Sequence, residues 1–128
     1  MNELLTPSTI AAPAAAYSLG VCSMAGSRLV HTSGIVGTAA DGTITADVTT
    51  QAEVVWASIA VILAEARMTL LDVVSYTTYV VVGQPLNEVM AVRDRVFAGH
   101  RPASTLILVP ALARPEWLIE ITVVAAAV

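Results

Sequence analysis

The sequence has few charged residues: they make up 12% of its 128 residues, against roughly a quarter in a typical soluble domain. With 56% hydrophobic residues, a monomer would expose much apolar surface. Burial of that surface in an oligomer is the simplest explanation, and a membrane is the alternative. The longest helical-looking apolar stretch, 54–64, is far shorter than the roughly 20 residues of a membrane-spanning helix. We therefore expect a soluble oligomer.

Basic residues are also scarce: six Lys and Arg against ten Asp and Glu give a net charge of −4. They cluster no more closely than Arg93 with Arg95 and His100 with Arg101, whereas binding a phosphate backbone requires several converging cations. We therefore expect no nucleic-acid partner. The single cysteine, Cys22, excludes an internal disulfide, and the two histidines form no metal-ligand spacing. We expect neither a metal nor a cofactor.

The length fits a single domain, 1–128. Residues 1–5 lack the basic segment of a secretory signal, so we expect a cytoplasmic protein. Turn residues and hydrophobic periodicity predict the order of the elements. These are an extended arm at 1–16, a hairpin of strands 17–24 and 28–35 with its turn at 25–27, a short strand at 43–45, a helix behind a Thr50–Glu53 capping box, a strand at 71–82, a helix at 86–98, and strands at 101–109 and 117–124. Two helices on one face of a mixed sheet would leave the other face uncovered, which again favours assembly.

Two charged side chains interrupt apolar patterns. Glu120 is the sole charge of the strand at 117–124, so its carboxylate must be paired, protonated or placed in a pocket. Arg93 lies at the centre of the apolar stripe of the second helix. Its guanidinium can either reach outward to solvent or lie in a pocket or interface, and the sequence leaves both alternatives open.

Five segments, in order and spacing, resemble the Rid (YjgF-like) family of reactive-intermediate imine deaminases. They are YSLGV at 17–21, VHTSG at 30–34, DVTTQ at 47–51, PA at 102–103 and IEI at 119–121. The resemblance covers nearly the whole chain. It implies a chorismate-mutase-like α+β domain that assembles as a homotrimer, with the open sheet faces inside and ligand clefts between subunits. It also implies hydrolysis of enamines and imines, such as 2-aminoacrylate, to a keto acid and ammonia.

The chain departs from the family in its Pro-Ala-Arg-Ser motif, whose arginine clamps the substrate carboxylate. Ser104 takes the place of that arginine, and a hydroxyl does not replace a bidentate guanidinium contact. Leu106 replaces a common cysteine, although its backbone could still bind an oxyanion, and Ile35 replaces a glutamine. Arg93 aligns with an asparagine that lines the family cleft. We hypothesise that Arg93 supplies a relocated cation that selects a different anionic substrate.

The other site residues follow from the resemblance. Glu120 matches the glutamate that positions or activates water, and the alternative is a structural pair with an arginine across a subunit interface. Tyr17 would orient the substrate, or merely anchor the start of a strand. Ser33 and Gly34 would bring backbone close to the ligand, or form a simple turn. Thr105 would bind an oxyanion, or only continue the strand ladder.

We therefore expect a small-molecule enamine or imine hydrolase with an atypical, pathway-specific and anionic substrate. The alternative is a non-catalytic ligand-binding or regulatory trimer that keeps the cleft and has lost the chemistry. The ribonuclease activity sometimes attributed to the family conflicts with the acidic charge balance.

Overall fold

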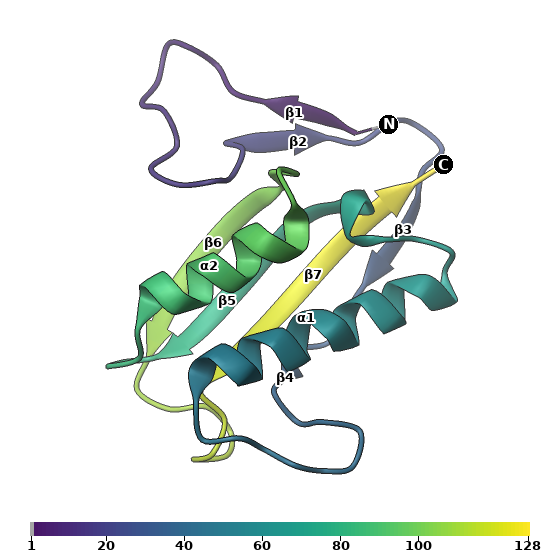
Figure 1. The fold of residues 1–128 in the computed structure, drawn as a ribbon. Helices are drawn as coiled ribbons and strands as arrows, with labels where there is room; N and C mark the ends of the chain where they lie inside the picture. The colour runs from purple at the N-terminus through teal and green to yellow at the C-terminus, as the bar shows by residue number, and fades with distance from the viewer. Residues whose placement is uncertain (1) are drawn as a thin grey trace.

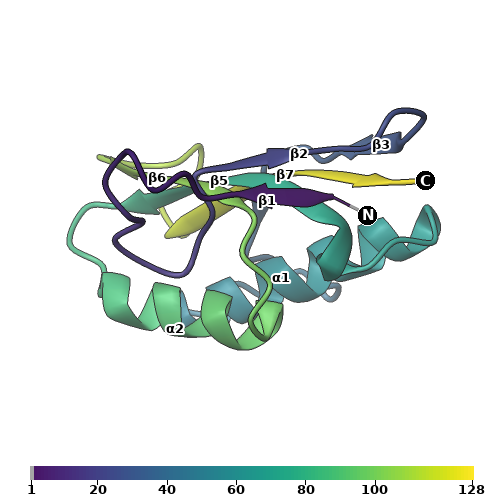
Figure 2. The same cartoon turned by 90° about the horizontal axis from the view of Figure 1, so that it is seen from above.

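The computed structural model describes residues 2–128, in which a layer of strands is backed by two helices on one side (Figures 1 and 2). The arrangement confirms the predicted α+β class with two helices on one face of a mixed sheet. The elements are β1 (Glu3–Leu5), β2 (Gly20–Cys22), β3 (Arg28–His31), β4 (Ile35–Val36), α1 (Val48–Glu65), the 3-10 turn η1 (Leu70–Asp72), β5 (Val73–Val81), α2 (Leu86–Phe97), β6 (Ala103–Val109) and β7 (Ile119–Ala127).

The main sheet has the order β3-β7-β5-β6, and β4 pairs with β7 beyond the end of β3. The strands β5 and β6 are parallel, whereas β3, β4 and β5 each run antiparallel to β7. The last strand of the chain therefore lies inside the sheet, with neighbours on both sides (Figure 1).

The predicted hairpin at 17–35 is wrong. The turn forms, with Gly26 at a φ of 79° and a hydrogen bond from the Ser27 N–H to the Met24 carbonyl. However, β2 pairs with β1, within the segment expected as an arm, while β3 pairs with β7. The physical reason is burial. Paired with β7, β3 places Val30 against the main core, and pairing with β2 at the edge of the molecule would not bury Val30 in this way. The short strand predicted at 43–45 is reduced to a single bridge between Thr38 and Ile44.

The helix α1 begins earlier than predicted. Asp47 is its N-cap, and Oδ2 of Asp47 accepts hydrogen bonds from the backbone N–H of Thr50 at 2.8 Å and from its hydroxyl at 2.7 Å. These bonds lower the pKa of the Asp47 carboxyl below its ordinary value. The Thr50–Glu53 capping box is therefore wrong, because an aspartate one turn earlier already satisfies the free helix N–H groups.

By length and composition α1 is the one helix within residues 2–128 that could cross a membrane, with 18 residues and a mean hydropathy of 1.3. In the fold, however, its apolar stripe packs on the sheet, and Val55, Ile59 and Leu63 are fully buried there. Core helices of soluble proteins commonly pass the same test, so the property carries no membrane assignment.

The second helix, α2, ends as predicted near Gly99, since Ala98 adopts a left-handed φ of 48° and Gly99 follows at 96°. Between the helices and the sheet, the rings of Trp56, Tyr76 and Phe97 pack together, with centroids 4.9 to 5.3 Å apart. This cluster fixes the position of Tyr76, which becomes important for the site.

Candidate functional site

Glu120 lies on the face of the sheet that no helix covers. Its neighbours Ile119 and Ile121 point into the core, so the alternation of β7 directs the Glu120 side chain to the opposite, open face. The side chain is half-buried, and it has neither an ion pair nor a side-chain hydrogen bond within residues 2–128. A half-buried carboxylate without a partner is available for chemistry.

Gly34 makes room for that carboxylate. A Cβ atom built at Gly34 would collide with Oε2 of Glu120 and would lie only 3.0 Å from its Cγ. Any side chain at this position would therefore displace the carboxylate. The sequence predicted that the Gly34 backbone lies close to a ligand, and in the structure the group next to Gly34 is the Glu120 side chain.

Gln51 positions the segment that leads into β7, a role that sequence reasoning missed. Its side chain is completely buried, and Nε2 donates to the carbonyl oxygens of Thr45 at 2.7 Å and Glu116 at 2.9 Å. Oε1 accepts from the backbone N–H of Leu118 at 2.9 Å. The available signal was an amide side chain on the apolar stripe of a helix. From the sequence alone, Gln51 was considered only as part of the DVTTQ segment that resembles the family.

On the opposite face of the sheet, polar side chains gather under α2. Arg93 is only 8% exposed, so it lies inside rather than reaching outward, which settles the alternative that the sequence left open. Nε and Nη2 of Arg93 contact the same oxygen, Oδ1 of Asp94, at 3.0 and 2.9 Å. Tyr76 and Ser104 are opposite each other in the β5-β6 register and face the same side. We call Tyr76, Arg93, Asp94 and Ser104 the helix-side cluster.

The Tyr76 hydroxyl in this cluster is buried and has no hydrogen-bond partner within residues 2–128. Burial raises the pKa of the Tyr76 phenol above its ordinary value of 10.0, and the nearby Ser104 hydroxyl and Arg93 guanidinium oppose part of this rise. Neither neighbour meets the hydroxyl in hydrogen-bond geometry. At neutral pH the phenol keeps its proton and can act as a hydrogen-bond donor.

A hollow of about 260 Å³ adjoins the helix-side cluster. It is lined by Ala16, Asp94, Phe97, Gly99, His100 and Arg101. Asp94 is a member of the cluster, and the Phe97 ring packs against Tyr76. Tyr17, next to the wall of the hollow, is half-buried, and its hydroxyl accepts a hydrogen bond from the Ala14 N–H at 3.4 Å.

The structure thus divides the predicted site residues between two faces. Glu120 and Gly34 meet on the open face, where Thr105 is also directed by its pairing with Thr77. Arg93, Ser104 and Leu106 lie on the helix side, whereas Ser33 is an exposed loop residue. Within residues 2–128 these two groups therefore lie on opposite sides of the sheet.

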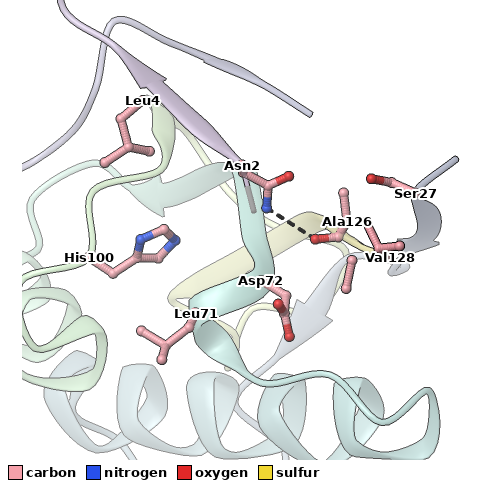
Figure 3. A pocket seen from close by; sticks show the side chains of 9 residues that line it. Asn2, Leu4, Ser27, Leu71, Asp72, His100, Ala126 and Val128 are labelled. Atoms are coloured by element: carbon pink, nitrogen blue, oxygen red, sulfur yellow. Dashed lines mark hydrogen bonds between the residues drawn. The ribbon is translucent and has the colours of Figure 1, made fainter. Parts of the chain in front are cut away.

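A larger hollow of about 540 Å³ lies between β1, η1 and the end of β7 (Figure 3). None of the predicted site residues lines it. Its polar side chains already bond to the chain: Asn2 to the Ala126 carbonyl, Ser27 to Met24, His100 to Val73, and Asp72 to the Thr69 N–H. We therefore place the candidate site at the helix-side cluster and at Glu120. Residues 2–128 also contain no group of His, Cys, Asp and Glu side chains that could hold a metal ion.

Comparisons with known proteins agree with the fold. A family model described as Endoribonuclease L-PSP matches residues 8–127. A Rid-family protein of unknown function from Yersinia pestis is 32% identical over 98% of both chains, with a TM-score of 0.86. A YjgF-family protein from Neisseria meningitidis is 31% identical over 85% of both chains, with a TM-score of 0.68. A member of the YjgF/YER057c/UK114 family from Mycobacterium tuberculosis is 26% identical over 99% of this chain and all of its own, with a TM-score of 0.70. No curated protein matches the chain.

Proposed function

The chain belongs to the YjgF/Rid family, and from this premise we propose that it hydrolyses an enamine or imine of a small anionic molecule to a carbonyl compound and ammonia. The observation that carries the proposal is the unpaired carboxylate of Glu120, held against Gly34 on the open face. Hydrolysis of an imine requires a water molecule at an electrophilic carbon and a proton for the leaving amine. A carboxylate in a partly dry site can assist both steps.

We further propose that the active protein is a homotrimer with the site between subunits. Within one chain Glu120 and Arg93 lie on opposite sides of the sheet, so a common cleft requires residues from two copies. The uncovered sheet face and the charged content of 12% support burial of that face.

Arg93 is proposed to bind the anionic group of the substrate, since Ser104 leaves the strand without a cation. The guanidinium of Arg93 is buried on the same side as Ser104. A cation that comes from the helix rather than from the strand would place the substrate anion differently from that of a 2-imino acid. The proposed substrate is therefore a small carboxylic acid whose enamine or imine group lies in a different position relative to the carboxylate than in a 2-imino acid.

The test is the rate of hydrolysis of 2-iminopropanoate, generated in situ, with the native protein and with Glu120→Gln. A double variant, Arg93→Asn with Ser104→Arg, moves the cation from the helix to the strand without placing two guanidinium groups together. We expect slow or no acceleration by the native protein. The double variant should gain roughly 10-fold or more, in line with a restored charged contact, and should lose the gain when Glu120→Gln is added.

If neither the native protein nor the double variant accelerates hydrolysis, the hydrolase proposal fails and a ligand-binding or regulatory trimer replaces it. The name of the matching family model suggests ribonuclease activity as another candidate. The net charge of −4 and the six basic residues disfavour RNA as a substrate. Incubation of native protein and Glu120→Gln with single-stranded RNA tests this directly, and cleavage by the native protein alone would favour the nuclease.

A further inference from the structure

We propose that the helix-side cluster is an exchangeable carboxylate site: Asp94 holds the Arg93 guanidinium until a ligand carboxylate displaces it and accepts a hydrogen bond from the Tyr76 phenol. This inference names the groups that recognise the ligand and rests on the proposed function for the identity of the site. Its test uses binding, so it does not require catalysis.

The first observation is the unpartnered hydroxyl of Tyr76. The residue is only 3% exposed, and a buried hydroxyl without a partner lowers stability. A phenylalanine would fill the same space between Trp56 and Phe97 without that cost. The Ser104 hydroxyl and the Arg93 guanidinium lie near enough to lower the pKa of the Tyr76 phenol, but neither meets its hydroxyl in standard hydrogen-bond geometry. Packing accounts for the ring of Tyr76, and a ligand oxygen would supply the partner that its hydroxyl lacks within residues 2–128.

The second observation is the way Asp94 binds Arg93. Two guanidinium nitrogens contact a single oxygen, Oδ1, so the contact is not the parallel two-oxygen pair that arginine forms with a carboxylate in the best geometry. The Asp94 side chain is 52% exposed, so it can turn toward solvent without leaving a buried charge. A free carboxylate with two accessible oxygens can form the better, parallel pair with Arg93.

The position of the cluster defines the size of the ligand. The adjoining hollow has a volume of about 260 Å³ and includes Asp94 in its wall, so movement of Asp94 would open the cluster toward the hollow. This volume lies below the roughly 300–1,000 Å³ of sites for drug-sized ligands. The chemistry of the cluster, a guanidinium and a phenol donor, therefore fits a small carboxylic acid.

Calorimetric titration of the full chain with propanoate and succinate tests the proposal, with the uncharged succinamide as the ligand control. Asp94→Asn removes the competing carboxylate and should tighten binding by about 2- to 5-fold, the range expected for a partly exposed ion pair. Glu53→Gln is the matched control, because it makes the same change in charge at an exposed pair with Arg95. This control should bind as the native protein does.

Tyr76→Phe removes the phenol hydroxyl and should weaken carboxylate binding by about 10-fold, while the temperature of unfolding stays equal or rises. Unchanged affinity in Tyr76→Phe, or a fall in its unfolding temperature, would overturn the proposal, since the hydroxyl would then be idle or structural. If Asp94→Asn bound the acids no more tightly than the native protein, the proposal would also be overturned. The same holds if neither the native protein nor Asp94→Asn bound propanoate or succinate. Binding with this pattern in a protein that hydrolyses no imine would contradict the proposed hydrolase function alone.

Discussion

The two faces of the main sheet are built from the same strands but differ in what their side chains contact. On β7 the residues directed toward the helices, Ile119, Ile121 and Val123, are at most 2% exposed. The residues between them on the open face, Glu120 and Thr122, are only half-buried. One face is therefore complete within a single chain, whereas the other retains side chains that the described residues 2–128 cover only in part.

The polar groups on the two faces also differ. On the helix side, Arg93 has Asp94 as a partner and is almost fully buried. On the open face, Glu120 has no partner within residues 2–128. A charge with an internal partner is stable in an isolated chain, while a half-buried charge without one depends on what packs on it or binds to it. The helix side therefore keeps its charged pair within the chain, whereas the open face leaves the Glu120 carboxylate for assembly or chemistry.

The largest expected effect is on the covered face. Ile121→Ala leaves a cavity among fully buried side chains and should lower the free energy of unfolding by about 2–5 kcal/mol. Urea unfolding at a fixed protein concentration measures it. Val61→Ala, at a position on α1 that is 66% exposed, should change stability by no more than about 0.5 kcal/mol. Similar losses in both variants would mean that the covered face is not the principal core.

A smaller effect on the fold but a clear one on assembly is expected on the open face. Ile107 is 39% exposed and shares this face with Tyr79, its partner in the β5-β6 register. If copies of the chain pack on this face, Ile107→Lys buries an unpaired charge at each contact. That should cost roughly 3 kcal/mol, or about 100-fold in the dissociation constant.

Sedimentation equilibrium of Ile107→Lys should therefore show dissociation, while Val61→Lys, which adds the same charge on the outer side of α1, keeps the native mass. An unchanged mass for Ile107→Lys would remove the open face as an assembly surface. The contrast between the two faces would then reflect solvent exposure alone.

The smallest expected effect concerns the helix α1 that covers the sheet. Hydrogen bonds from Thr50 hold the pKa of Asp47 below its ordinary value of 3.8, so the charged form stabilises the folded state. That contribution is present above pH 3.8 and is lost as the pH falls through the lower pKa of the folded state. Asp47→Asn keeps a capping side chain without the titration, so its stability should fall less between neutral and acidic pH. Equal acid sensitivity in thermal unfolding would contradict this assignment.

The sequence was sufficient to predict the class of the fold, because the local apolar patterns are those that the observed layers require. The periodic apolar residues of α1 and α2 and the apolar runs of β5 and β7 depend on burial alone, so the two-helix, one-face arrangement could be predicted. The pairing of β2 and β3 could not be predicted, because it depends on contacts between strands that are distant in the sequence. The start of α1 could not be predicted either, because it depends on whether Asp47 or Thr50 caps the helix. Gly26 marks the same kind of turn whether the next strand pairs back on β2 or crosses to β7.

For the candidate site, sequence patterns select Glu120 and Arg93 as candidates because each places a charge among apolar residues. They could not identify Tyr76, because a tyrosine in a strand of Val, Thr and Tyr is ordinary until its hydroxyl is seen to lack a partner. They also could not separate Ser104 from Thr105 by face, since that assignment required the register of β5 and β6.

The central place of β7 affects how the chain is made. Residues 119–127 fill the gap between β3 and β5, and they are synthesised after both of these strands. Until they emerge, β3 has no partner and one edge of β5 is unpaired, so the face that the helices cover is incomplete. The sheet can therefore close only after β7 has emerged, and until then the open strand edges are exposed to aggregation.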